Sequence, residues 1–153
     1  MALEGALVAR VARQLDDAGW RVVVARPSQT RIFFTVNGRR KAPDLVAWRN
    51  GELLVLEAKV HASALFREDE GGFSDYWCMQ ALASQPGLQD QLIERVKPML
   101  RGVADLAASC PRFLCGLLAG QAFSHEQIAS AAPLLCLHAD AQQGVISGGD
   151  ALL

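Results

Sequence analysis

The dipeptide Asn50-Gly51 separates two apolar, β-prone runs, residues 45–48 and 53–60. Asn-Gly is the strongest short-range signal for a two-residue hairpin, because both turn residues adopt positive φ. Such a turn also fixes the register, since residues equidistant from it must face each other. The sequence therefore predicts an antiparallel hairpin in which Trp48 faces Leu53 and Val46 faces Val55.

The same register brings two carboxylates together. Asp44 is predicted to face Glu57, with their Cβ atoms roughly 4.5–5.5 Å apart, and like charges so placed are destabilising unless a cation lies between them. Period-two alternation puts Lys59 on the face of Glu57 and puts Leu54, Leu56 and Ala58 on the other. Two interpretations stay open: a divalent metal site, or a Glu57–Lys59 ion pair at the strand end with Asp44 in solvent.

The remaining patterns predict an alternation of helices and strands. We expect helices at 2–18, 74–84, 88–108 and 124–132, with a kink at Pro98 in the third and a Ser124/Gln127 capping box at the start of the fourth. We expect strands at 20–26, 31–36, 39–48, 52–60, 113–119 and 134–137. Residues 61–72 are predicted to form a loop, and the weakly patterned tail from 139 is predicted to be partly disordered. The strands from 31 to 60 read as one antiparallel meander. This order predicts the α/β class, as a three-layer sandwich with a central mixed sheet.

Length and composition fit one soluble domain, residues 1–153. The chain is 51% hydrophobic and 20% charged, as in ordinary globular domains. It contains no run of about 20 apolar residues and no signal-peptide pattern, so we expect a cytoplasmic protein without a membrane partner. The four cysteines include no Cys-x-x-Cys pair, which argues against a zinc cluster.

The net charge of −1 conceals an asymmetry. Residues 1–50 hold nine Lys and Arg against four Asp and Glu, a surplus of +5, whereas residues 51–153 carry a deficit of −6. A basic segment is a candidate surface for nucleic-acid phosphates. The candidate contacts are Arg26, Arg31, Arg39, Arg40 and Lys41, and a solvated β-surface is the alternative. We expect Arg95 and Arg101, on the later helix, to lie outside this surface.

Glu4 is a further candidate, because the phase of the first helix places it within the apolar stripe that faces the core. A purely structural explanation is also available, since acids in the first turn of a helix are stabilised by its dipole.

Taken together, these residues resemble the PD-(D/E)xK nuclease superfamily. Pro43-Asp44, twelve intervening residues and then Glu57-Ala58-Lys59 match its motif, on a predicted hairpin that follows a Glu-bearing helix. The resemblance covers about residues 1–120 and implies an αβββαβ core, similar to restriction-endonuclease-like and Holliday-junction-resolvase-like domains. Residues 121–153 would add a C-terminal helix, strand and tail. The long stretch at 61–86 departs from the pattern.

The resemblance implies a specific site. Asp44, Glu57 and the carbonyl of Ala58 would bind Mg²⁺, which Mn²⁺ could replace, since these ions prefer oxygen ligands. Asp44, Glu57, Lys59 and Glu4 would be the catalytic residues. Lys59 would contact the phosphate or orient the attacking water, and Glu4 would bind the ion through water or contribute to a second site.

We therefore expect a Mg²⁺-dependent endonuclease that hydrolyses DNA to 5′-phosphate and 3′-hydroxyl ends in defence, repair or recombination. Its partners would be DNA and either further copies of itself or the other subunits of a larger nuclease complex. Two alternatives remain: a non-catalytic, nuclease-like module that binds nucleic acid or protein, and an RNA-directed nuclease.

Overall fold

A computed structural model describes residues 2–100 and 111–153 of the chain. Its helices are α1 (Ala2–Asp17), α2 (Ala62–Phe66), α3 (Asp75–Ser84), α4 (Pro86–Val96), the 3₁₀ turn η1 (Lys97–Leu100) and α5 (His125–Ala131). Its strands are β1 (Arg21–Ala25), β2 (Phe34–Val36), β3 (Arg39–Lys41), β4 (Leu45–Arg49), β5 (Glu52–Lys59), β6 (Arg112–Ala119), β7 (Leu135–Asp140) and β8 (Gly144–Ser147).

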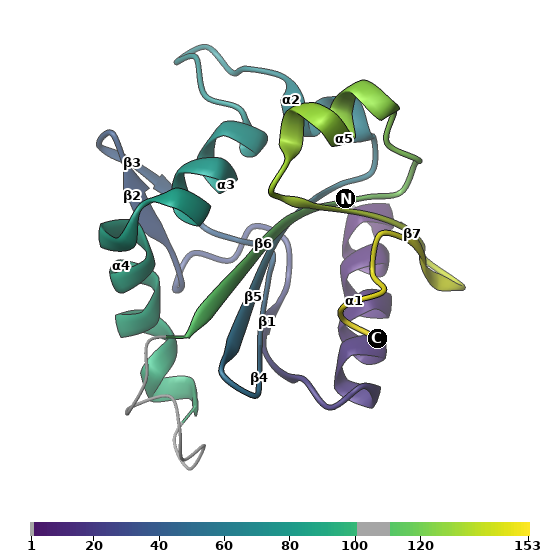
Figure 1. The fold of residues 1–153 in the computed structure, drawn as a ribbon, viewed down its shortest axis with the longest axis horizontal. Coiled ribbons are helices and arrows are strands. Elements are labelled where there is room, and N and C mark those ends of the chain that lie inside the picture. The colour runs from purple at the N-terminus through teal and green to yellow at the C-terminus, as the bar shows by residue number, and fades with distance from the viewer. Residues whose placement is uncertain (1, 101–110) are drawn as a thin grey trace.

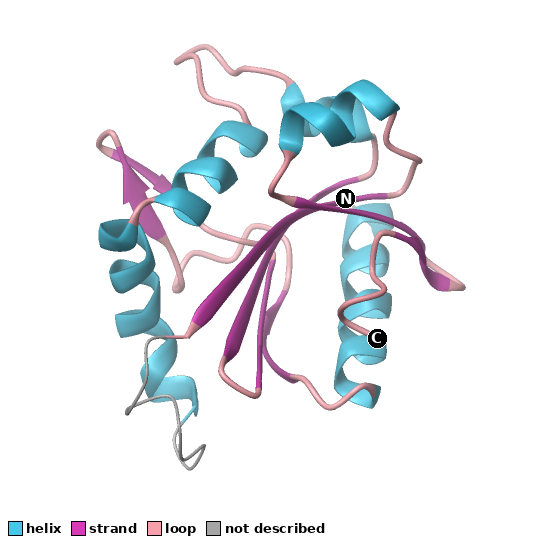
Figure 2. Ribbon diagram, in the orientation of Figure 1, coloured by secondary structure: helices cyan, strands magenta, loops and turns pink. Residues whose placement is uncertain are grey.

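Six strands form a curled central sheet in the order β1-β4-β5-β6-β7-β8. β5, β6 and β7 run parallel, whereas β1, β4 and β8 pair antiparallel with their neighbours. Helix α1 covers one face, and α3 and α4 lie beyond the other (Figures 1 and 2). The predicted three-layer α/β sandwich with a mixed sheet is confirmed. Within the described residues, no helix has both the length and the apolar character needed to cross a bilayer.

The sheet separates two hydrophobic cores, and β5 contributes to both. Leu53 and Val55 belong to the core under α3 and α4. Leu54, Leu56 and Ala58 belong to the core under α1. This is the predicted alternation of strand faces, and it places the C-terminal end of β5, with its charged residues, beside the buried interior.

The predicted hairpin at Asn50-Gly51 is confirmed together with its register. Trp48 pairs with Leu53, and Val46 pairs with Val55. Asn50 and Gly51 have φ values of 47° and 82°, which is the left-handed conformation that a type I′ turn requires. Local turn chemistry therefore fixed this pairing.

The predicted single meander from 31 to 60 is wrong. β2 and β3 form a separate two-stranded sheet, and the predicted strand 39–48 is divided between β3 and β4. The break includes Pro43, which has no N–H for a ladder hydrogen bond. β1, rather than the strand around 31–36, pairs with β4.

Two further boundaries differ from the predictions. The stretch at 61–72 contains the short helix α2, which buries Ala62 and Leu65 and is too brief to show a period. The helix predicted at 88–108 begins at Pro86 and ends at Val96, and Pro98 lies in the 3₁₀ turn that follows. The rest of that predicted helix, 101–108, lies outside the described residues.

The tail is ordered, in contrast to the prediction. β7 extends to Asp140 and a hairpin returns as β8. The Gln14 side chain of α1 accepts a 2.8 Å hydrogen bond from the Val145 amide, and Trp20 donates a 2.9 Å bond to the Leu152 carbonyl. Contacts with the N-terminal part of the chain therefore hold a segment whose local pattern is weak.

Candidate active site

Asp44 lies immediately before β4 and is only 6% exposed. Its amide donates a 3.1 Å hydrogen bond to the carbonyl of Leu56, which already pairs with Leu45 in the β4–β5 register, so the regular ladder ends at this point. The Ala58 amide donates a 2.8 Å hydrogen bond to Asp44 Oδ2. The carboxylate therefore fills the position where a further residue of β4 would otherwise bond to β5, and its second oxygen is left for another partner.

Glu57 is buried beside Asp44, at 4% exposure. Its Oε1 atom is fully buried and has no hydrogen-bond partner in the part of the chain that the structure describes. Burial and the neighbouring Asp44 carboxyl raise the pKa of Glu57 well above its usual value, although Lys41 opposes the shift. An unpartnered buried carboxylate oxygen is costly, and a bound cation would relieve that cost.

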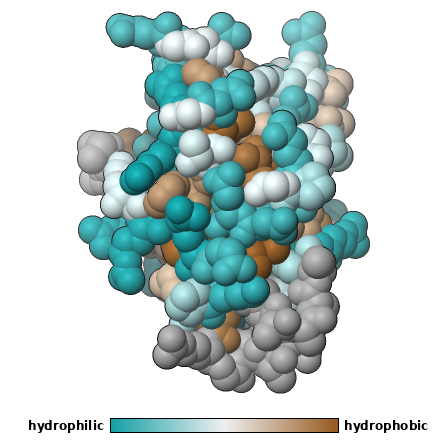
Figure 3. Space-filling model, turned by 90° about the vertical axis from the view of Figure 1, so that its left-hand side faces the viewer, coloured by the Kyte–Doolittle hydropathy of each residue, from teal (hydrophilic) through white to brown (hydrophobic). Residues whose placement is uncertain are grey.

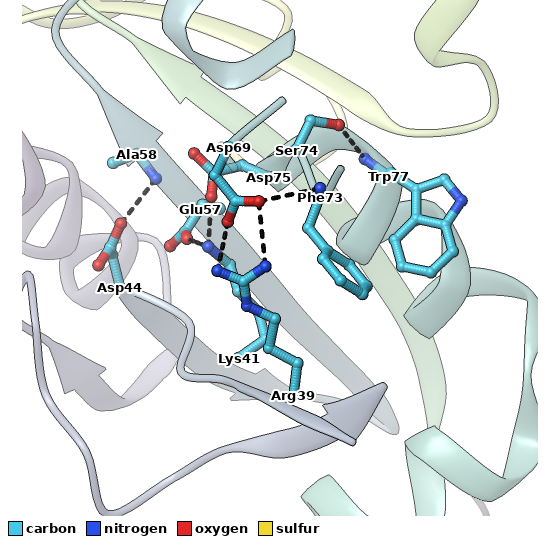
Figure 4. Close-up of polar contacts among 10 residues, drawn as sticks. All are labelled: Arg39, Lys41, Asp44, Glu57, Ala58, Asp69, Phe73, Ser74, Asp75 and Trp77. Carbon is cyan, nitrogen blue, oxygen red and sulfur yellow. Dashed lines mark hydrogen bonds and ion pairs between the residues drawn. The ribbon is translucent and has the colours of Figure 1, made fainter. Parts of the chain in front are cut away.

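The cation beside Glu57 in this structure is Lys41, which the sequence placed on the basic surface. Its ammonium group forms ion pairs with Glu57 Oε2 and with Asp75 Oδ1 (Figure 4). The Lys41 side chain is 18% exposed. Burial lowers the pKa of Lys41, but the carboxylates of Glu57 and Asp75 outweigh this effect and raise it overall.

Lys59 ends β5 and borders an open hollow of about 490 Å³, whose lining includes Phe73 and Asp75. It forms no ion pair within residues 2–100 and 111–153. The alternative of a simple Glu57–Lys59 pair is therefore not what the structure contains. Lys59 remains available to a ligand in the hollow.

Glu4 lies in the first turn of α1 and is partly buried. Burial raises the pKa of Glu4, Lys59 lowers it and Asp44 raises it. Charges act on a pKa in this way only at short range, so the N-terminal end of α1 places Glu4 within electrostatic range of Lys59 and Asp44.

The oxygen donors available to a divalent ion are Asp44, Glu57 and the Ala58 carbonyl. In a strand, the N–H and C=O of one residue point to the same side, so the Ala58 carbonyl faces the edge to which its amide donates. This edge has Asp44 on it and Glu57 Oε1 nearby. Among the described residues no group of three or more His, Cys, Asp or Glu could hold a metal. Two carboxylates and a carbonyl suit a hard ion that keeps several waters.

The predicted basic residues other than Lys41 are all exposed, namely Arg26, Arg31, Arg39 and Arg40. Figure 3 faces the side on which β2, β3 and α4 lie, where polar side chains cover much of the surface.

Two of these arginines have defined contacts. Arg39 forms a 2.5 Å ion pair with Asp69 and lies over the Phe73 ring (Figure 4). Arg40 stacks on Phe33, with its guanidinium carbon 4.4 Å from the ring centroid.

Arg95 stacks on the same Phe33 ring, at 3.9 Å. The expectation that Arg95 lies apart from the basic surface is therefore wrong, because α4 packs beside the β2–β3 hairpin (Figure 1). Arg101 lies outside the described residues.

No pattern in the sequence indicates that Lys41 and Asp75 lie together beside Glu57. The two are 34 positions apart. Asp75 also has a local explanation, since it follows the N-cap Ser74, whose side chain accepts a 3.0 Å hydrogen bond from the Trp77 amide. Only the tertiary fold, which brings the start of α3 to the end of β3, joins them.

No protein-family model and no curated protein matches the chain. Among solved structures, an XisH family protein from Nostoc punctiforme is 16% identical, with a TM-score of 0.45, over 93% of this chain and 97% of that one. An FdxN element excision controlling factor protein from Anabaena variabilis is 15% identical, with a TM-score of 0.44, over 93% and 96% of the two chains. Similarity at this level does not identify the residues of a functional site.

Proposed function

We propose that this protein is a metal-dependent nuclease of the PD-(D/E)xK type that cleaves DNA to 5′-phosphate and 3′-hydroxyl ends. The observation that carries the proposal is the buried pair Asp44 and Glu57, with Glu57 Oε1 unpartnered among the described residues. Two desolvated acids on adjacent strand ends are unfavourable for stability alone. Their arrangement is explained if they bind a cation.

In this proposal Asp44, Glu57 and the Ala58 carbonyl hold Mg²⁺ or Mn²⁺. The bound ion would supply Lewis-acid polarisation of the phosphate and a more acidic water. The Ala58 amide fixes the orientation of Asp44 through its 2.8 Å hydrogen bond. The protein thus presents its oxygen ligands from packed strands, which limits their movement during the reaction.

Lys59 would act on the substrate rather than on the ion. It borders the hollow and has no ion-pair partner among the described residues. A positive charge at this point would stabilise the negative charge that develops on the scissile phosphate. Glu4, partly buried near Lys59 and Asp44, would orient a metal-bound water or take part in a second ion site.

The backbone of the nucleic acid would run over the exposed arginines Arg26, Arg31, Arg39 and Arg40. Of these, Arg39 reaches the hollow through its ion pair with Asp69, which lines it. Arg95 joins this surface because it shares Phe33 with Arg40. Phosphate contacts of this kind position a substrate without reading its sequence.

The test is incubation of the purified protein with Mg²⁺ or Mn²⁺ and plasmid, linear, branched and single-stranded DNA, and with RNA. The Glu57→Ala variant serves as the control for contaminating nucleases. We expect DNA cleavage by the parent, ends that a ligase can rejoin, and no cleavage by the variant.

The same panel separates the alternatives. Cleavage of RNA alone would identify an RNA-directed nuclease. Salt-dependent binding without cleavage of any substrate would identify a non-catalytic binding module. Either outcome would overturn the proposed DNA nuclease.

A further inference from the structure

The two oxygens of the Glu57 carboxylate have different environments. Oε2 is paired with the Lys41 ammonium group, whereas Oε1 has no hydrogen-bond partner within the described residues. Lys41 is paired at the same time with Asp75 Oδ1 (Figure 4). One oxygen of the carboxylate is therefore already engaged, and only the other is free for an ion.

The Lys41–Asp75 pair is built into packed elements on both sides. Lys41 ends β3, where it pairs with Phe34, a residue with no exposed surface. Asp75 begins α3, whose cap residue Ser74 is buried and accepts a hydrogen bond from the Trp77 amide. Because neither element is a free loop, the ammonium group is held against Glu57 from two directions.

We propose that Lys41, anchored by Asp75, limits Glu57 to a single oxygen toward a divalent ion and thereby makes the site select Mg²⁺ over Ca²⁺. The inference rests on the proposed metal-dependent function. Mg²⁺ requires a compact octahedral set of ligands at about 2.0–2.1 Å, whereas Ca²⁺ accepts 6–8 oxygens and often binds a carboxylate through both. Lys41 is thus a specificity-determining residue that acts through Glu57.

The test measures binding of the ions themselves, without substrate. Calorimetric titrations of the whole chain with MgCl₂ and, separately, with CaCl₂ give the ratio of the two dissociation constants. Lys41→Met and Lys41→Leu both free Oε2, because neither side chain has a hydrogen-bond donor. We expect each to shift the ratio toward Ca²⁺ by about 10-fold, the size typical of changes to residues that orient metal ligands. Lys41→Arg keeps a cationic donor and should preserve the parent ratio.

The ratio distinguishes selection from simple electrostatics. Loss of a nearby positive charge strengthens the binding of both divalent ions alike, so it leaves the ratio unchanged. Lys97→Met is the matched control, since it removes a lysine that is 43% exposed and paired with Glu94. If circular dichroism shows that neither neutral Lys41 variant folds, Asp75→Asn removes the anchor and should shift the ratio in the same direction.

The outcomes also separate this inference from the proposed function. A parent protein that binds neither ion would overturn both. Metal binding by the parent with an unchanged ratio in the folded variants would overturn only the role of Lys41. A shift of the same size in Lys41→Arg would show that side-chain shape, and not a donor on Oε2, sets the ratio of dissociation constants. That result would also overturn the proposed role of Lys41.

Discussion

The Ala58 amide donates a 2.8 Å hydrogen bond to the side chain of Asp44, where β5 extends beyond the first residue of β4. The bond gives Asp44 a structural task, because it satisfies a buried backbone donor. It also leaves the second carboxylate oxygen available to a ligand. Substitutions at this position can therefore separate stability from catalysis.

We predict that Asp44→Asn and Asp44→Ala both abolish cleavage but differ in stability. The asparagine carbonyl can still accept from the Ala58 amide, whereas alanine leaves that buried donor unpaired, at a cost of about 1–3 kcal/mol. Urea unfolding measures the difference and a cleavage assay measures the loss. Glu94→Gln, which changes an exposed acid on α4, should affect neither. Full activity of Asp44→Asn would remove Asp44 from the site.

We predict that Glu57→Gln stabilises the metal-free protein near neutral pH. The pKa of Glu57 is raised in the folded state by burial and by Asp44, so the folded protein binds the proton more tightly than the unfolded chain. Proton binding by Glu57 therefore stabilises the folded state. This stabilisation is complete below pH 4.5, the pKa of the residue in the unfolded chain, and is lost as the pH rises through the raised pKa of the folded state. Glutamine removes this loss because it does not ionise.

The measurement is the free energy of unfolding in EDTA from pH 4 upward, for the parent and for Glu57→Gln. Their difference isolates Glu57, because Glu4, whose pKa burial also raises, titrates in both proteins. Mg²⁺ at about 100 times its dissociation constant should then stabilise only the parent, by about 2.7 kcal/mol. If the free energy of unfolding in EDTA changed with pH equally in the parent and in Glu57→Gln, the assigned environment of Glu57 would be wrong.

We predict that Lys59→Ala lowers turnover about 100-fold while metal affinity stays close to that of the parent. An ammonium group has no acceptor and cannot ligate a metal ion, and loss of a group that stabilises transition-state charge has an effect of about this size. Single-turnover cleavage and calorimetry measure the two quantities. Lys97→Ala is the control for removal of a surface lysine. Lost metal binding with normal turnover would contradict the role of Lys59.

We predict that Arg40→Gln combined with Arg95→Gln weakens duplex binding and flattens its salt dependence. If each arginine, stacked on Phe33, contacts one phosphate, the log–log slope should fall by about 1.8, since each contact contributes about 0.9. The titrations use the inactive Asp44→Asn protein without metal. The control, Arg13→Gln with Arg112→Gln, makes an equal change of charge elsewhere and should leave this slope unchanged. If the slope fell only in the control, the binding surface would lie near Arg13 and Arg112 and not at Arg40 and Arg95.

The sequence by itself determined the features that depend on neighbouring residues. Asn50-Gly51 specified the β4–β5 hairpin and its register, because a two-residue turn fixes which residues face each other. Ser124 and Gln127 likewise specified the start of α5 through a reciprocal capping box. The register in turn brought Asp44 beside Glu57, so the central pair of the candidate site followed from local information.

Only the tertiary structure decided which cation accompanies that pair. Lys59 shares a strand with Glu57, yet Lys41 forms the ion pair, since the fold brings the end of β3 and the start of α3 to the Glu57 side chain. The fold also brings Arg95 to Phe33, and it orders the tail through Gln14 and Val145. Such contacts join residues far apart in the chain, and their energies depend on burial and packing that a local sequence pattern does not contain.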